Sequence, residues 1–159
     1  MNLDDVLKYG HRTVTHALDG LTEDQANVNG VCGHWSVREI VAHLASHELL
    51  MVEVLASFLD ASAPMPTLNA YFEQKSAFND IEVEKRQALS FADLVSEYEA
   101  AFAKTRELAA QVPVGKRREV GAIPWYGAEY DLEDLAAYSN YAHKREHCAQ
   151  IAVYRDTLN

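Results

Sequence analysis

Residues 35–59, WSVREIVAHLASHELLMVEVLASFL, decide the fold class of this chain. Ser36 and Glu39 form the S-x-x-E pattern of a capping box, in which each side chain bonds a free backbone N–H at the start of a helix. Trp35 stands directly before this cap. The apolar residues that follow recur at the spacing of a helix face. The stretch therefore predicts a long helix from Ser36 to about Leu59.

Three more segments show helical periodicity. The first runs from about Asn2 to Asp19, with Gly20 as a plausible stop. The next runs from Ser90 to about Gln111, and the last from Asp131 to about Arg155. Ser90 and Asp131 are both residue types that cap helix starts. Neither an internal repeat nor a low-complexity tract is visible in the sequence.

The connections between these helices suggest how they are arranged. About 30 residues separate the second helix from the third, which exceeds the 2–8 residues usual in bundles. This link includes a weaker helical stretch, Leu68 to Leu89, and is long enough to cross the whole bundle. The second and third helices could therefore run parallel, with the first and fourth antiparallel to them. Val114 to Tyr130 reads as a loop. We predict an all-α four-helix bundle in a single domain, residues 1–159.

Composition narrows the classes of function. The chain has 159 residues, of which 48% are hydrophobic and 24% charged, as in a globular domain. Its 14 Lys and Arg against 24 Asp and Glu give a net charge of −10, which argues against binding nucleic acid or an anionic membrane. The 2 cysteines form no disulfide framework, and the N-terminal residues lack a signal-peptide pattern. We therefore expect a cytoplasmic protein that acts on a small molecule.

Two histidines interrupt the apolar stripe of the second helix. Ile40, His43, His47, Leu50 and Val54 follow one face, so both histidines point where an ordinary bundle would have apolar side chains. The fourth helix shows the same pattern.

On the fourth helix, His143 and His147 are spaced i, i+4 and share a face. Asn140 lies before them and Gln150 after them on the same stripe. Burying a polar group without a partner costs about 1–3 kcal/mol, so four such groups need something to bond with.

An H-x-x-x-H pair on one helix is a bidentate metal site that needs a third ligand. Taken alone, such a pair is more often structural or incidental. Here His43 or His47 supplies the third nitrogen from a facing helix, at nearly the same level if the second and fourth helices are antiparallel. The Glu-x-x-His pairs of ferritin-like sites and the H-x-x-x-E of hemerythrin-like sites are absent from the sequence. The pattern favours a mononuclear, mostly histidine site.

Residues 35–44, WSVREIVAHL, and 141–151, YAHKREHCAQI, resemble the DinB/YfiT-like superfamily of small four-helix proteins. The resemblance implies an up-down-down-up bundle with a long crossover between helices two and three. It also implies one divalent metal ion, zinc or nickel, on three histidines that correspond to His43, His143 and His147. Members are often dimers. Characterised relatives include transferases and isomerases that use a low-molecular-weight thiol, and proteins that protect against reactive metabolites.

Five further residues each have more than one reading. His47 is an addition to the family pattern and is a fourth ligand, a partner of a ligand, or part of the pocket wall. Gln150 and Asn140 either bond a ligand histidine or bond across the bundle. Trp125 and Tyr126 precede the fourth helix and either roof the metal pocket or close the core.

These features lead to a functional hypothesis. We expect a divalent-metal-dependent enzyme that performs thiol transfer, with a low-molecular-weight thiol as co-substrate, or hydrolysis. No carboxylate stands in phase as a general base, which slightly favours thiol activation, and the sequence identifies no catalytic residue beyond the metal ligands. Two alternatives use the same residues: a non-catalytic protein that captures small molecules for self-protection, and a bundle in which the metal is structural.

Overall fold

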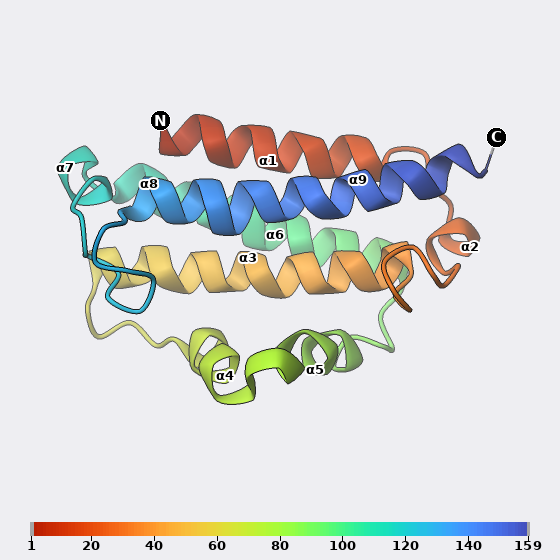
Figure 1. Cartoon of the computed structure of the whole chain (residues 1–159), viewed down its shortest axis with the longest axis horizontal. Coiled ribbons are helices and arrows are strands. Elements are labelled where there is room, and N and C mark those ends of the chain that lie inside the picture. The colour runs from red at the N-terminus through yellow and green to blue at the C-terminus, as the bar shows by residue number, and fades with distance from the viewer. Residues whose placement is uncertain (1, 159) are drawn as a thin grey trace.

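The computed structural model describes residues 2–158, so the two end residues of the expected 1–159 domain lie outside the described part. Four long helices run side by side (Figure 1). α1 and the fourth helix run in one direction, and α3 and α6 run in the other. This is the up-down-down-up order that was predicted. The long helices are α1 (Leu3–Leu18), α3 (Val37–Leu59), α6 (Phe91–Gln111), and a fourth built from α8 (Leu132–Leu135), η2 (Ala136–Tyr141) and α9 (Ala142–Asp156).

Local capping explains where the helices start. The Ser36 hydroxyl accepts from the Glu39 N–H at 3.3 Å, and the Ser36 N–H donates to the Glu39 carboxylate at 2.7 Å. The same reciprocal arrangement begins α6 at Ser90 and α8 at Asp131. Each box satisfies two backbone donors that would otherwise be free at the helix start. The sequence therefore places these three helix starts correctly.

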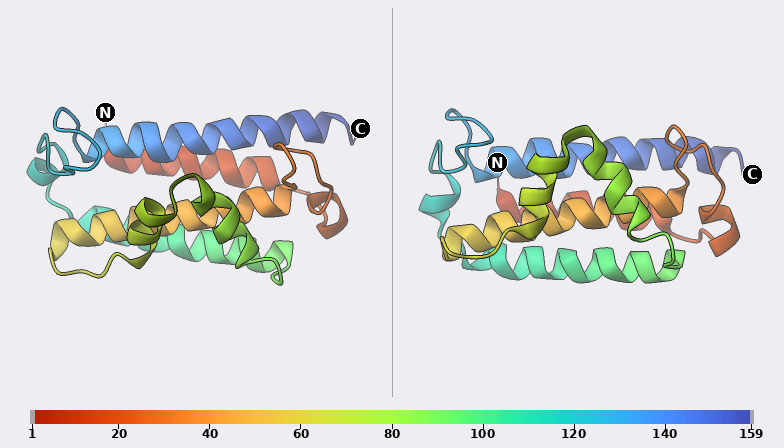
Figure 2. Two further views of the ribbon diagram at one scale, coloured as in Figure 1. Left: turned by 60° about the horizontal axis from the view of Figure 1, so that its bottom comes forward. Right: turned by 90° about the horizontal axis from the view of Figure 1, so that it is seen from below.

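The crossover from α3 to α6 is more broken than the single helical stretch expected over Leu68 to Leu89. It consists of α4 (Pro66–Gln74), a 3₁₀ turn η1 (Lys75–Ala77) and α5 (Phe78–Glu84). Figure 2 shows this segment lying across α3, outside the four long helices. The Glu53 carboxylate of α3 accepts from the backbone N–H groups of Thr67 and Leu68, at 2.9 and 2.8 Å. These bonds attach the start of α4 to α3.

The other connections contain short helices. α2 (Glu23–Ala26) lies between α1 and α3, and α7 (Val114–Arg117) stands at the start of the segment expected to be a loop. The fourth helix also departs from a uniform α-helix, because η2 is a π-helical turn. Such turns widen the i→i+4 ladder by one residue and occur frequently at functional sites. Here the turn ends directly before the segment that carries His143.

The apolar core is divided into two parts. One cluster lies toward the α2 end and includes Trp35, Leu44 and Ile151, and the other lies toward the α7 end and includes Leu7, Leu55 and Leu135. Buried polar side chains of α3 and of the fourth helix belong to neither cluster: His43, Glu48, Asn140, Lys144 and His147. A polar layer thus crosses the bundle.

Helix α3 is the core helix of this bundle. Among the described residues it alone has the length and hydropathy of a membrane span, and 67% of its most apolar window is buried inside the protein.

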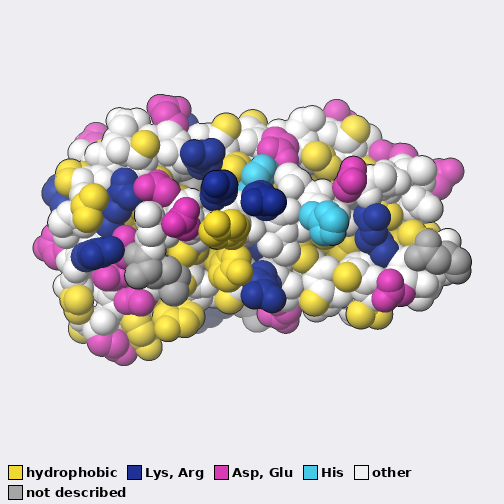
Figure 3. Space-filling model, turned by 90° about the horizontal axis from the view of Figure 1, so that it is seen from above, with side chains coloured by type: hydrophobic (Ala, Val, Ile, Leu, Met, Phe, Trp, Pro, Cys, Tyr) yellow, Lys and Arg dark blue, Asp and Glu magenta, His cyan; other side chains and the backbone are white. Residues whose placement is uncertain are grey.

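On the outer face shown in Figure 3, acidic, basic and hydrophobic side chains are intermixed.

An ion pair joins two helices within the polar layer. Lys144 Nζ lies 2.5 Å from Glu48 Oε2, and the two side chains are only 2% and 0% exposed. Asn140 bridges them, because its Oδ1 accepts from Lys144 Nζ at 3.0 Å and its Nδ2 donates to Glu48 Oε2 at 3.3 Å. The pair therefore couples α3 to the fourth helix through buried, opposite charges.

Replacing one partner should destabilise the protein strongly. Lys144→Met leaves the Glu48 carboxylate buried without a counter-charge, and we expect a loss of about 3–5 kcal/mol in the free energy of unfolding. The double variant Lys144→Met/Glu48→Leu should lose clearly less. Urea denaturation measures both. Lys104→Met is the control, because Lys104 forms an exposed pair with Glu107 that contributes less than about 1 kcal/mol. Equal losses for Lys144→Met and Lys104→Met would contradict the assigned role.

Candidate metal centre

The four histidines of the two predicted stripes meet between α3 and α9. The ring centroid of His143 lies 4.8 Å from that of His43, 4.5 Å from that of His47 and 4.7 Å from that of His147. His43 is as close to its neighbours, at 4.4 Å from His47 and 4.8 Å from His147. The structure thus brings together all the histidines that the spacing singled out.

Three of these rings direct the same nitrogen to one place. Nε2 of His143 lies 2.8 Å from Nε2 of His43 and 3.1 Å from Nε2 of His147. A neutral imidazole nitrogen has one proton or one lone pair, so this single atom cannot serve both neighbours well. Nitrogens around a tetrahedral zinc ion stand about 3.3 Å apart, because each Zn–N bond is about 2.0–2.1 Å. Both separations from His143 Nε2 are therefore near, and slightly below, the spacing of two nitrogens that share one cation.

Gln150 sets the orientation of one ring. His147 Nδ1 donates to Gln150 Oε1 at 2.8 Å, which leaves the lone pair of His147 on Nε2, toward the other histidines. Gln150 therefore bonds a histidine of the cluster, which was one of its two readings. His43 Nδ1 is buried and has no hydrogen-bond partner among the described residues. Trp35 covers His43 on this side, with ring centroids 5.0 Å apart.

His47 occupies a different position. Its Nε2 donates to Asn79 Oδ1, at 3.1 Å, on helix α5 of the crossover. It still belongs to a group with His43 and His143 whose ligand atoms all lie within 4.8 Å of one another. Two overlapping triads are therefore present, which share His43 and His143 and differ in whether His47 or His147 is the third member. The distances among their ligand atoms show that His43, His47 and His143 could hold a metal ion, and His147 adjoins this group through His143.

Burial keeps these rings neutral. Desolvation lowers the pKa of His43 far below its usual range, and mutual repulsion among the protonated histidines lowers it further. The same two effects lower the pKa of His143 to about 3. Desolvation also lowers the pKa of His47 and of His147. Neutral imidazoles have free lone pairs, which is the state that metal binding needs.

A cavity of about 500 Å³ reaches His47 and His143. Its walls come from α3, from α4 of the crossover, from the loop before α8 and from the fourth helix, and its lining residues include Trp125 and Tyr126. Both aromatic residues therefore border the cavity that leads to the histidines. Asn140 lines it too, but its amide holds the Glu48–Lys144 ion pair, so it bonds across the bundle.

Sequence reasoning missed three polar residues around the histidines. Glu48 and Lys144 had a readable signal, because Glu48 stands four residues after the apolar Leu44 and Lys144 four residues after Asn140, so each shares a helix face with a residue that is buried. Asn79 had none, since only the path of the crossover brings it to His47.

The buried histidines make stability depend on pH. In chelator-treated, metal-free protein, the unfolded state takes up protons near pH 6.5, whereas folded His143 does so only near pH 3. The free energy of unfolding should therefore fall as the pH is lowered from about 6.5 toward 3. At pH 5 one such histidine lowers the free energy of unfolding by about 2 kcal/mol. His143→Gln should reduce the pH slope, and urea denaturation at several pH values measures it.

Exposed His16→Gln, on α1, is the control for this measurement and should keep the wild-type slope. His11, whose pKa burial lowers to about 4, adds a slope of the same sign, so His143→Gln removes only part of the effect. Identical slopes for His143→Gln and wild type would show that His143 is not buried neutral in the folded protein.

Comparison with known proteins places this fold. A model of the mycothiol maleylpyruvate isomerase N-terminal domain matches residues 7–135, a range that contains His43 and His47 and ends before His143 and His147. A crystal structure of an uncharacterised protein from Escherichia coli UTI89 is similar, with a TM-score of 0.79 and 15% sequence identity. The similarity covers 99% of this chain and 92% of that chain, and it shows the fold alone. No curated protein matches the chain.

The family match extends over most of the chain, and the helix order agrees with the superfamily that residues 35–44 and 141–151 resemble. The chain belongs to the mycothiol maleylpyruvate isomerase N-terminal domain family, within the DinB/YfiT-like superfamily.

Proposed function

We propose that this protein is a divalent-metal-dependent enzyme that joins a low-molecular-weight thiol to a small molecule. The observation that carries the proposal is the convergence of neutral histidine nitrogens beside a cavity of about 500 Å³. Cavities of this size, with a few convergent polar groups, are typical of small-molecule sites. Hydrolysis is the second form of the same proposal, in which water replaces the thiol.

His43, His143 and His147 are the ligand set that we favour. Nε2 of His143 already lies close to Nε2 of both His43 and His147, and Gln150 holds His147 in the tautomer that a ligand needs. His47 Nε2 donates its proton to Asn79, so only its Nδ1 has a lone pair, and we place His47 at the cavity wall rather than among the ligands. Three protein ligands leave a coordination position open, as in catalytic rather than structural sites. Neutral imidazoles suit zinc and nickel.

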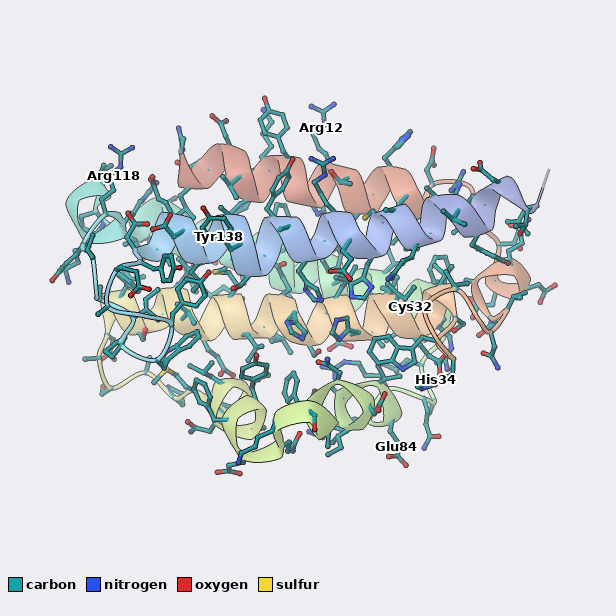
Figure 4. All side chains as sticks on the ribbon, in the orientation of Figure 1. Arg12, Cys32, His34, Glu84, Arg118 and Tyr138 are labelled. Carbon is teal, nitrogen blue, oxygen red and sulfur yellow. The ribbon has the colours of Figure 1, made fainter. Side chains whose placement is uncertain are left out.

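The positions and chemistry of the chain's own two cysteines favour a reacting thiol that comes from outside the protein. Cys148 is buried, and desolvation raises the pKa of its thiol to about 11, which makes it a poor nucleophile. Cys32 lies on the loop before α3, at the α2 end of the bundle (Figure 4). The family description also names a thiol, mycothiol, for the protein after which it is called. A bound divalent cation would lower the pKa of a thiol or of water that it holds, and so supply a nucleophile at neutral pH.

The surroundings of the histidines suit such a reaction. Trp35 and the packed helices exclude water on one side, while the cavity admits a substrate on the other. His47, held by Asn79, borders the cavity and is the side chain best placed to exchange a proton with a bound molecule.

Self-protection by binding alone is the competing function. It is favoured by one observation: the residues that line the cavity include no carboxylate to act as a general base.

Partners and location belong to the same proposal. A net charge of −10 disfavours nucleic acid and anionic membranes. Both cysteines are free, which suits a reducing cytoplasm. A homodimer is proposed on the resemblance to the superfamily.

Metal content distinguishes the two triads. Wild-type protein purified without a histidine tag should hold about one zinc, nickel or similar ion per chain, measured by plasma mass spectrometry. His143→Ala and His147→Ala should each lose the ion, because they remove a ligand, whereas His47→Ala and the control His16→Ala should keep it. Loss in His47→Ala with retention in His147→Ala would assign the other triad. Wild-type protein that stays empty after addition of divalent metals would overturn the metal proposal.

Turnover tests the reaction. Metal-loaded protein is mixed with mycothiol, bacillithiol or glutathione and an uncharged thiol acceptor such as dimethyl maleate, and thiol consumption is followed. We expect multiple turnovers with at least one thiol, reduced to the uncatalysed background in His143→Ala. Cys32→Ser should keep the wild-type rate, because the reacting thiol is external. Binding of the acceptor without turnover would favour the self-protection function instead.

A further inference from the structure

The cavity is lined by uncharged side chains, apart from any charge that its histidines acquire. Among its thirteen lining residues there is no Lys, Arg, Asp or Glu. The polar groups are two histidines, Ser139, Asn140, the hydroxyls of Tyr71 and Tyr126 and the N–H of Trp125, and the remaining lining is apolar. Burying a carboxylate against such walls without a cation is strongly unfavourable, because the charge loses its hydration.

The nearest buried cation is not free to pair with a ligand. Lys144 is already neutralised by Glu48 at 2.5 Å, and it lies behind Asn140. Asn140 itself uses its Oδ1 on Lys144 and its Nδ2 on Glu48. A carboxylate of a ligand that no metal ion balances would therefore meet hydrogen-bond donors but no cationic side chain in the cavity. The net charge of −10 also repels a dianion at long range.

Aromatic rings form the outer wall of the cavity. Phe72 of α4 contacts Trp125 of the loop before α8 edge to face, with centroids 5.4 Å apart. Tyr71 and Tyr126 extend this array on either side, at 5.6 Å from Phe72 and 6.1 Å from Trp125. Although they line a cavity, Phe72 and Trp125 remain 42% and 43% exposed. Exposed faces of adjacent rings are favourable surfaces for stacking a planar apolar molecule.

We propose that the cavity binds an uncharged substrate with a planar, ring-containing body, and that it excludes dicarboxylic acids. This inference rests on the proposed function for the position of the reacting group, next to the histidines. The aromatic array would hold the ring, and the reacting end would point toward His143. Selection arises because a neutral ligand loses little hydration on entering apolar walls, whereas a dianion would leave at least one charge unpaired.

A matched pair of unreactive probes tests the inference. Dimethyl phthalate and phthalate share a ring skeleton and differ in carrying no charge or two negative charges. Binding is measured by titration calorimetry on wild-type protein, both metal-loaded and metal-free. We expect dimethyl phthalate to bind at least about tenfold more tightly than phthalate to metal-free protein, and to show a smaller preference in metal-loaded protein, where a divalent ion on neutral histidines adds positive charge. Trp125→Ala should weaken its binding at least about fivefold, while Tyr9→Ala, which removes an exposed ring of α1, should leave it unchanged.

The outcomes separate this inference from the proposed function. Tighter binding of phthalate, equal binding of the two probes, or no binding of either would overturn the substrate class. Preference for the ester with the expected Trp125→Ala effect would support the substrate class even if the protein held no metal and turned over no thiol. In that case the proposed enzymatic function alone would fail.

Discussion

The Glu48–Lys144 ion pair links α3 to α9 in the middle of the bundle, and the histidine cluster depends on that link. Glu48 follows His47 directly on α3, and Lys144 follows His143 directly on α9. Bringing the two charges together therefore sets the axial level and rotation at which the histidines of the two helices face one another. A buried charge without its partner is costly, so alternative registers of α9 against α3 are disfavoured. The polar layer is thus a constraint on helix packing as well as a chemical site.

Burial of this polar layer opposes folding, because its side chains lose hydration. The same burial determines the protonation state of the histidines. Desolvation holds the histidines neutral, so their lone pairs are available to a cation rather than occupied by protons. Gln150 and Asn79 then set the roles of the two outer rings. His147 presents Nε2 to the cluster because its Nδ1 proton goes to Gln150, and His47 directs its Nε2 proton away, to Asn79. One amide therefore leaves Nε2 of His147 with a lone pair toward the cluster, and the other engages Nε2 of His47, which borders the cavity.

The long crossover connects the topology of the bundle to its site. Two parallel neighbours, α3 and α6, need a connection that returns along the whole bundle, and this connection lies across α3, the helix that carries His43 and His47 (Figure 2). It contributes Asn79 to His47 and the rings of Tyr71 and Phe72 to the cavity. A segment required by the helix order thus also shapes the space in which a substrate would lie. The loop before α8 completes the wall with Trp125 and Tyr126.

The sequence by itself determined the helices and the histidine faces, because both depend on interactions within about four residues. The capping box at Ser36 and the i, i+4 histidine pairs could be read locally, and the length of the crossover indicated the helix order. Tertiary structure alone decided which buried groups are partners. Residues that meet in the site are far apart in the chain: 100 positions separate His43 from His143, 92 separate Asn140 from Glu48 and 32 separate His47 from Asn79. Periodicity predicts which face a side chain occupies, but the level and rotation of one helix against another come from packing, and the cavity exists only where packed segments leave space.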